Sequence, residues 1–413
     1  MAAVETPTVH DICAEAKRAS RGLAQLDAAS KDAALHAIAD ALEARVDEIL
    51  EANAIDLEAG REAGLSSALT DRLRLDTDRV AAMAAGARAI AALPDPVGEV
   101  IDGQRLPNGL DVRKVRVPLG VIGVVYEARP NVTIDAAALC LKSGNAIILR
   151  GSSSAANSNA VLATIAAGAA PEGAIQLLGG GRDALAELAT QDGLVDLVIP
   201  RGGEGLKAAL RDVATVPVIY AASGNCHVYV DATADLDRAV DVVVNAKTQR
   251  PGVCNAAETL LVHASVAERF LPLVATALRD RSVQLRGDER ARAHVEMAAA
   301  SEEDWDTEFL ALVLAVGVVD SAQEAIAHVN RHGSGHSEAI LTRDTEAARL
   351  FQRGVDAACV YVNASTRFTD GGEFGMGAEI GNSTQKLHAR GPIGLRELCT
   401  FKYLVEGDGH VRA

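Results

Sequence analysis

Short apolar runs alternate with stretches of helical periodicity from residue 121 to about residue 200. Each run has the length of a strand buried on both faces, and short links join it to the next helix. Such β-α repetition predicts an open parallel sheet with right-handed connections. The expected strands are 121–126, 145–150, 174–178 and 194–199, and the helices between them include 133–142 and 155–169.

The same alternation returns after residue 231, so we expect an α/β protein with two open parallel-sheet domains. The expected helices are 237–247, 266–278 and 321–332, and the expected strands are 259–262, 309–319, 338–341 and 359–362. We place the first domain at 1–230, the second at 231–373, and a C-terminal segment at 374–413 that ends in a strand.

The first 95 residues favour helices, and a hairpin follows them. Leu35, Ile38, Leu42, Val46 and Ile49 form one apolar stripe, which predicts a helix over 33–50. Asn and Gly at 108–109 are a strong two-residue turn signal inside the segment 99–118. The first domain is therefore interrupted by a hairpin.

Bulk composition excludes several classes of protein. The 413 residues carry a net charge of −16, which argues against nucleic acid as the main partner. The longest apolar run, 310–319, is too short to span a bilayer. Residues 1–21 lack the basic start and apolar core of a signal peptide. No C-x-x-C or His-x-x-x-His pattern indicates a metal, so we expect a cytoplasmic protein with free thiols and no metal site.

Cys254 is the candidate nucleophile. It follows Pro251 and Gly252 at the end of an expected helix and precedes an apolar strand, so a turn presents its thiol. Lys247 and Arg250 are close in sequence, and nearby cations favour the reactive thiolate. A lone cysteine is more commonly a small buried hydrophobe, which is the reading we give to the other cysteines.

Two glycine-containing segments follow strands and are candidates for binding a nucleotide, although the ordinary G-x-G-x-x-G fingerprint is absent. The first holds Arg150, Gly151, Ser152 and Ser153, whose hydroxyls and guanidinium suit a ribose or its phosphate. An ordinary helix start with a solvated arginine fits the same residues. The second segment is 201–205, with Gly202 and Gly203.

Asn131 and Glu308 are candidates from the polar residues beside strands. Asn131 lies between an expected strand and helix, where an asparagine serves as an N-cap or donates to a developing oxyanion. Glu308 is either a surface carboxylate or an acceptor for ribose hydroxyls. The basic stretch 386–390 either meets an anionic substrate or is simply solvated.

Several segments together resemble the aldehyde dehydrogenase superfamily, and more narrowly its branch that reduces an acyl phosphate. They are VPLGVIGVVYEARPNVT at 117–133, KSGN at 142–145, GVCNAAET at 252–259, and the run from 374 to 402. The resemblance covers essentially the whole chain. It implies the two-domain fold of that superfamily and a small oligomerisation flap, built from the hairpin and the C-terminal strand, and hence a homo-oligomer.

The resemblance also implies roles for the candidate residues. Cys254 matches the nucleophile and Asn131 the side-chain oxyanion donor. Arg150, Gly151 and Ser152 match the grip on the adenosine ribose, with Ser153 beside them. Gly202 and Gly203 match positions near the pyrophosphate and nicotinamide, and Glu308 matches the residue that holds the nicotinamide ribose. Five residues are guesses for substrate binding: Arg129, Arg201, Lys386, His388 and Arg390.

One departure from the superfamily is informative. Hydrolytic members carry a general-base glutamate where this chain reads AASGN at 221–225. Without that base, exchange of a thioester with phosphate is favoured over hydrolysis. The branch it resembles implies reduction of L-glutamyl 5-phosphate by NADPH, a step toward proline, and hand-over of that labile substrate from glutamate 5-kinase.

Three alternatives stay open on sequence alone. The chain could be another acyl-CoA or aldehyde oxidoreductase of the same fold. It could be a non-redox acyltransferase that uses Cys254, which would transfer acyl groups without a change in nicotinamide absorbance. It could also be a nucleotide-binding scaffold without catalysis, for which Cys254→Ala would change nothing measurable.

Overall fold

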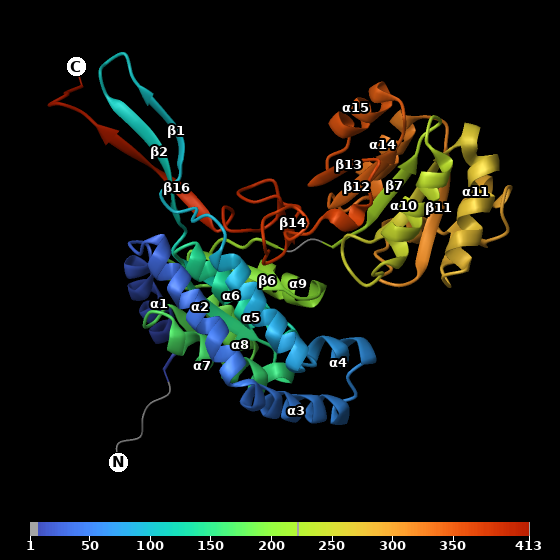
Figure 1. Ribbon diagram of the computed structural model, residues 1–413. Helices are drawn as coiled ribbons and strands as arrows, with labels where there is room; N and C mark the ends of the chain where they lie inside the picture. Colours follow the sequence, from blue (N-terminus) through green and yellow to red (C-terminus); the bar gives the residue numbers. More distant parts are fainter. Residues whose placement is uncertain (1–6, 221–222, 413) are drawn as a thin grey trace. The chain divides into compact units, whose positions relative to one another are not determined.

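The computed structural model describes residues 7–220 and 223–412. Ala221 and Ala222, part of the stretch that lacks the general base, lie outside these residues, as does the start of the segment 1–21. The chain forms two compact units (Figure 1). The first comprises Met1–Ala221, Gly375–Gly381 and Ile393–Ala413, and the second comprises Ala222–Phe374 and Asn382–Pro392.

The first unit is built on a four-stranded parallel sheet in the order β5-β4-β3-β6. Strand β3 is apolar and buried along its whole length, and β4 is so over 146–149, as parallel strands covered on both faces require. Every strand predicted here is present. The bounds are β3 Val121–Tyr126, β4 Ala146–Gly151, β5 Ile175–Leu177 and β6 Leu197–Arg201.

Helices cover this sheet in layers. Helix α1 packs on β3, β4 and β5 and against α8, whereas α6 and α7 pack on the same strands and are covered by α2, α3 and α5. Right-handed crossovers place α6 and α7 on one face and the return helix α8 on the other. The helices are α1 Val9–Leu23, α2 Ala28–Ala44, α3 Val46–Glu62, α4 Ser67–Leu73, α5 Thr77–Ala91, α6 Asn131–Lys142, η1 Ser153–Ala155, α7 Ala156–Ala169, α8 Arg182–Leu188 and α9 Glu204–Val213.

A separate antiparallel sheet of three strands extends from the first unit. The hairpin β1 (Val100–Arg105) and β2 (Asp111–Pro118) is present as predicted, and β16 (Cys399–Glu406) pairs with β2 along its length. The order is therefore β1-β2-β16.

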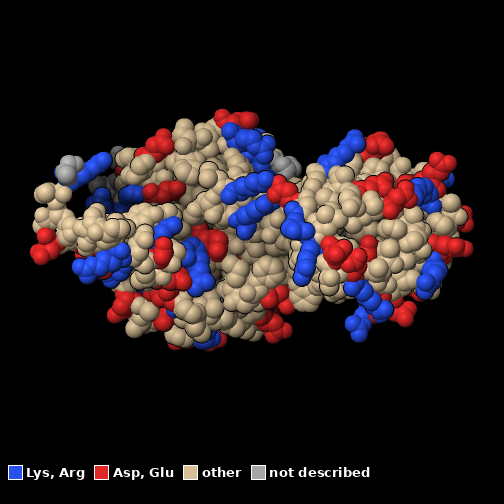
Figure 2. All heavy atoms as spheres, turned by 90° about the horizontal axis from the view of Figure 1, so that it is seen from above, with Lys and Arg blue, Asp and Glu red and all other residues tan. Residues whose placement is uncertain are grey.

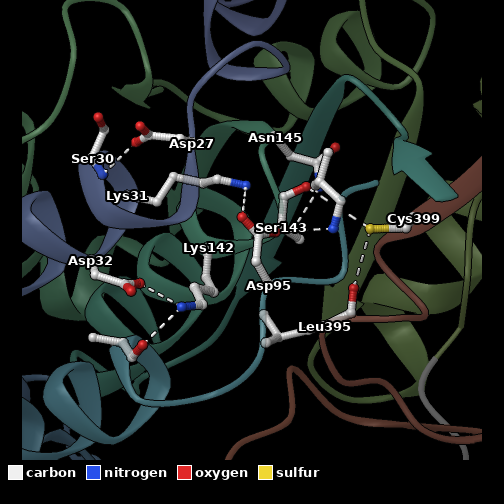
Figure 3. A network of polar contacts seen from close by, with 12 residues as sticks. Asp27, Ser30, Lys31, Asp32, Asp95, Lys142, Ser143, Asn145, Leu395 and Cys399 are labelled. Atoms are coloured by element: carbon white, nitrogen blue, oxygen red, sulfur yellow. Dashed lines mark hydrogen bonds and ion pairs between the residues drawn. The ribbon is translucent and has the colours of Figure 1, made fainter. Parts of the chain in front are cut away.

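A buried polar network anchors the base of this small sheet (Figure 3). Asn145 donates to the carbonyl of Leu398 at 2.9 Å and accepts from the Gly120 N–H at 2.7 Å. Lys142 is 1% exposed and donates to Asp32 and to the carbonyl of Ala91. The KSGN segment therefore joins β4, the helical layer and β16, which gives this family motif a structural role.

The second unit is built on a seven-stranded parallel sheet in the order β10-β9-β11-β8-β7-β12-β13. A two-stranded antiparallel ladder, β14-β15, accompanies it. The strands are β7 Cys226–Val230, β8 Ala257–His263, β9 Gln284–Gly287, β10 Ala298–Ala299, β11 Val313–Val319, β12 Ser337–Leu341, β13 Cys359–Val362, β14 Asn382–Ser383 and β15 Gly391–Pro392.

Neighbouring residues of the central strands enter opposite cores. Val228 and Leu260 join Phe270 of α11 in one cluster, while Tyr229 and Leu261 join another cluster on the opposite side. Both faces of the sheet are thus buried. The helices are α10 Leu236–Thr248, α11 Ala264–Arg279, α12 Glu289–Arg292, α13 Glu302–Asp306, α14 Ala322–His332, α15 Thr345–Gly354 and η2 Thr366–Phe368.

Four expectations need correction. The helix predicted over 33–50 is interrupted at Arg45, whose backbone leaves the helical region between α2 and α3. The strand predicted over 309–319 begins only at Val313. Strand β7 ends at residue 230 but pairs in the second unit, so the unit boundary precedes it. The segment 374–413 is divided between the two units.

Surface charge is mixed. On the face shown in Figure 2, Lys and Arg side chains are interspersed with Asp and Glu. No helix among the described residues is both long and apolar enough to cross a membrane.

Candidate active site

Cys254 lies in the loop between α10 and β8, after the turn that Pro251 begins. It is partly exposed, whereas the other cysteines are buried. Burial raises the pKa of Cys13 to about 11 and that of Cys399 to about 12, so those thiols stay protonated. The structure thus separates one accessible thiol from five structural ones.

Gly224, which lies just before β7, and Cys226, the first residue of β7, hold the backbone of Cys254. A Cβ atom placed on Gly224 would stand 1.5 Å from the carbonyl oxygen of Cys254, so only glycine permits this approach. The Cys226 thiol donates to the same carbonyl at 3.2 Å. The nucleophile's peptide group is therefore fixed from two sides.

Glu308 meets the nucleophile loop through the same glycine. Its carboxylate accepts a hydrogen bond from the Gly224 N–H at 2.7 Å, and the side chain is partly buried. The structure thus brings Glu308 and Cys254 together around Gly224. Because Glu308 accepts this backbone hydrogen bond, it is not the solvated surface carboxylate that the sequence also allowed.

Lys247 does not act on the thiol as a free cation. It is fully buried and forms an ion pair with Glu258, which is also fully buried. The Leu310 N–H donates to the second carboxylate oxygen at 3.2 Å. The expectation that Lys247 favours the thiolate is therefore wrong, because Glu258 compensates its charge. Arg250, by contrast, is exposed.

Asn131 is the first residue of α6, and Pro130 occupies the N-cap position, so the N-cap reading is wrong. The exposed carboxamide donates to Asp135 at 3.0 Å. Burial raises the pKa of Asp135 to about 6, against the opposing effects of Asn131 and Arg201. Asn131 and Arg201 are thus brought together around one carboxyl group in the first unit.

The segment after β4 makes close internal contacts. Arg150 donates to the carbonyl of Gly181 at 2.6 Å, while its buried Nε has no hydrogen-bond partner among the described residues. The Ser152 hydroxyl accepts from the Ala128 N–H at 3.1 Å. Ser153 begins η1. A Cβ on Gly151, the last residue of β4, would stand 1.9 Å from the Asn159 amide nitrogen, so a larger residue would displace that buried side chain.

A carboxylate already occupies the turn before α9. The Gly203 N–H, at the N-cap of α9, donates to Glu127 at 3.0 Å. A Cβ on Gly202 would stand 2.6 Å from the Glu127 carboxyl carbon. Helix N-termini favour anions, and here a side chain of the protein supplies one. Sequence reasoning missed Glu127, because nothing in its own segment indicates this distant partner.

The guessed substrate residues fall into separate groups. Arg201 ends β6 with its guanidinium beside Gly381 in the first unit. In the second unit Lys386 and Arg390 share the carboxylate of Asp356, at 2.5 and 2.8 Å. His388 is exposed between them, with a φ of 68°. The remaining guess, Arg129, is partly exposed and lies between β3 and α6.

The part of the chain that the structure describes contains no group of three or more His, Cys, Asp or Glu side chains arranged to hold a metal ion.

Comparison with known proteins places the chain in a family. The family model described as "Aldehyde dehydrogenase family" matches residues 1–304 and 295–402. The chain belongs to the aldehyde dehydrogenase family, and the fold class expected from the sequence is confirmed.

Close relatives refine this assignment. A protein of Thermobifida fusca is 55% identical over 411 residues, covering 98% of both chains, and one of Moorella thermoacetica is 58% identical over 404 residues, covering 96% of this chain and 97% of the relative. Both are named gamma-glutamyl phosphate reductase. The crystal structure of a gamma-glutamyl phosphate reductase from Thermotoga maritima superposes with a TM-score of 0.96 at 47% identity, covering 98% of this chain and all of the other. The narrower resemblance read from the sequence is thereby confirmed.

Proposed function

We propose that this protein reduces L-glutamyl 5-phosphate to L-glutamate 5-semialdehyde and phosphate with NADPH, a step toward proline. The observation that carries the proposal is the single accessible thiol of Cys254, fixed by Gly224 and Cys226. The names of the relatives at 55% and 58% identity give the substrate.

Cys254 performs the covalent step in this proposal. Its thiolate attacks the acyl carbon, a carbon–sulfur bond forms, and the bond to the phosphate oxygen breaks with release of phosphate. The resulting thioester divides one difficult reduction into two easier steps. Hydride addition then gives a thiohemiacetal oxyanion, which collapses to the aldehyde and regenerates the thiolate.

Asn131 and the Cys254 N–H are the proposed oxyanion donors. Asp135 accepts one hydrogen of the Asn131 carboxamide, which orients that amide and leaves its second N–H for the developing charge. One such donor lowers a barrier by roughly 3–4 kcal/mol.

A nicotinamide cofactor fits the residues expected to hold it. The unpartnered Nε of Arg150 and the tight turn at Gly151 suit a ribose or its phosphate, together with Ser152 and Ser153. We assign Gly202 and Gly203 to the pyrophosphate side and Glu308 to the nicotinamide ribose. When bound, the cofactor supplies the hydride. We propose that NADP is preferred over NAD because the positive charge of Arg150 suits a ribose phosphate.

The α-carboxylate of the substrate needs positively charged residues to bind it. We propose Arg129, Arg201, Lys386, His388 and Arg390 as the candidates for its α-carboxylate, although Asp356 already neutralises two of them. A labile acyl phosphate further suggests direct transfer from glutamate 5-kinase in the cytoplasm.

We also propose a homo-oligomer formed through the sheet β1-β2-β16. This sheet exposes large apolar side chains that a second copy of the chain would cover. They are Val100, Ile101, Phe401, Tyr403 and Val405.

The reaction run in reverse tests this function. With glutamate 5-semialdehyde and NADP, NADPH should form beyond one equivalent per enzyme only when inorganic phosphate is present, and Cys254→Ser should abolish its formation. Turnover without phosphate would indicate a hydrolytic aldehyde dehydrogenase instead. Acyl transfer with unchanged nicotinamide absorbance would indicate an acyltransferase.

A further inference from the structure

A second cationic group, Arg367, belongs to the same local structure as the nucleophile. It lies in η2, a short helical turn. Asn255, the residue after the nucleophile, forms hydrogen bonds to residues of this turn through both its backbone and its side chain. The Thr366 hydroxyl donates to the Asn255 carbonyl at 2.6 Å, and the Asn255 carboxamide donates to the carbonyls of Thr369 at 2.9 Å and Arg367 at 3.3 Å. The turn and the Cys254 loop are therefore one hydrogen-bonded assembly.

In the described part of the chain, a single hydrogen bond, from its Nε, holds the Arg367 guanidinium. Its Nε donates to the Gln249 side chain at 2.8 Å, and the residue is half-buried. Among the described residues, its two terminal nitrogens have neither a hydrogen bond nor an ion pair, and Arg250 likewise has none. Two other arginines of this unit differ in this respect, since Arg286 pairs with Asp304 and Arg290 with Asp320.

Arg367 lies close enough to both Arg250 and Cys254 for their charges to act on it. Burial lowers the pKa of Arg367, and the neighbouring Arg250 lowers it further, whereas Cys254 and Asp370 act in the opposite direction. Holding two guanidinium groups together without a carboxylate ion pair costs free energy, and a bound dianion offsets that cost. A planar guanidinium also matches two oxygens of a phosphate at once.

We propose that Arg367, together with Arg250, binds the phosphoryl group of the acyl phosphate, and inorganic phosphate when the reaction runs in reverse. This deepens the proposed function and rests on it. As the Cys254 sulfur bonds to the acyl carbon, the carbon–oxygen bond to phosphorus breaks and phosphate leaves with the electron pair. The two guanidinium groups stabilise that leaving charge, and the departing phosphate takes up a proton from water to become hydrogen phosphate.

The test measures alkylation of Cys254 by iodoacetamide without any cofactor, with inorganic phosphate as the probe. Phosphate should slow alkylation of the wild type, relative to sodium chloride at equal ionic strength. In Arg367→Gln the half-protecting phosphate concentration should rise at least tenfold, and in Arg367→Lys by less. Arg353→Gln is a matched control, since this exposed arginine of the same unit donates through Nε to a backbone carbonyl.

Two results would overturn the proposal. The first is that phosphate protects Arg367→Gln and the wild type at the same concentration, while the variant has the same melting temperature as the wild type. The second is a variant that shifts only the pH profile of alkylation, which would make Arg367 an activator of the thiol. In the reverse reaction the KM for phosphate should rise with an unchanged KM for semialdehyde. Because protection needs no turnover, it remains measurable even if Cys254→Ser leaves the reduction intact and the proposed function fails.

Discussion

Gly224 supports the peptide of Cys254 so closely that no larger residue fits: an added Cβ would stand 1.5 Å from the Cys254 carbonyl oxygen. Gly224→Ala should therefore displace the thiol, because the contact is with backbone and cannot be relieved by a side-chain rotation. We expect kcat to fall at least 100-fold, since misplacement by about 1 Å costs that much. Steady-state kinetics of the reverse reaction measures it.

Gly168→Ala is the control for that substitution. Gly168 lies within α7, and an added Cβ there meets nothing within 4 Å. We expect unchanged kinetics and a gain of about 0.5–1 kcal/mol in the free energy of unfolding from helix propensity. Full activity in Gly224→Ala would show that the loop tolerates a shift and that the thiol is not held as described.

Glu258→Gln should strongly destabilise the second unit. It would leave the fully buried Lys247 without its counter-charge, at a cost of about 3–5 kcal/mol. Trp305, the single tryptophan, lies in this unit, so urea unfolding followed by its fluorescence reports the change. The double variant Lys247→Met, Glu258→Leu should recover most of the loss. A change below about 1 kcal/mol in Glu258→Gln would contradict this account.

Asp135 should make the stability of the first unit depend on pH. Burial raises its pKa to about 6 in the folded state, above the unfolded value, so ionisation opposes folding as pH rises through this range. Asp135→Asn removes that cost. Its stability advantage over wild type should be small near pH 4, grow up to about pH 6 and stay constant above, reaching on the order of 3 kcal/mol. Urea unfolding followed by circular dichroism measures it, and an advantage that shrinks with pH would refute the burial argument.

Glu127 should compete with the cofactor phosphates for the N-terminus of α9. Its carboxylate accepts the Gly203 N–H that a phosphate would otherwise use. Anions at this position contribute about 0.3–1 kcal/mol, so Glu127→Gln should tighten NADPH binding about two- to fivefold. Fluorescence titration of NADPH gives the Kd. Weaker binding in the variant would mean that Glu127 itself holds the cofactor.

The sequence predicted the parts of the fold that local pattern determines. The apolar run of β3 matches its observed bounds, because a strand buried on both faces needs an unbroken series of such residues. The break at Arg45 was missed because the apolar stripe continues through it. Strand β9 was missed because it carries one buried aliphatic side chain, Leu285, among polar and glycine residues.

The sequence predicted those site residues for which the reactive group and the turn that presents it lie in one short segment. Cys254 after Pro251 and Gly252 is such a case. Arg367, and the Glu258 that neutralises Lys247, were not predicted in these roles. Their contacts join residues from separate elements, and only the folded sheet brings those elements together.

Acylation of Cys254 is the central claim, and intact-protein mass spectrometry tests it most directly. Enzyme mixed with glutamate 5-semialdehyde and NADP, with phosphate left out, should gain the mass of one glutamyl group. Peptide mapping should place that group on Cys254, and added phosphate should remove it. Stoichiometric NADPH formation with no adduct on Cys254, or with the adduct on another residue, would contradict the account.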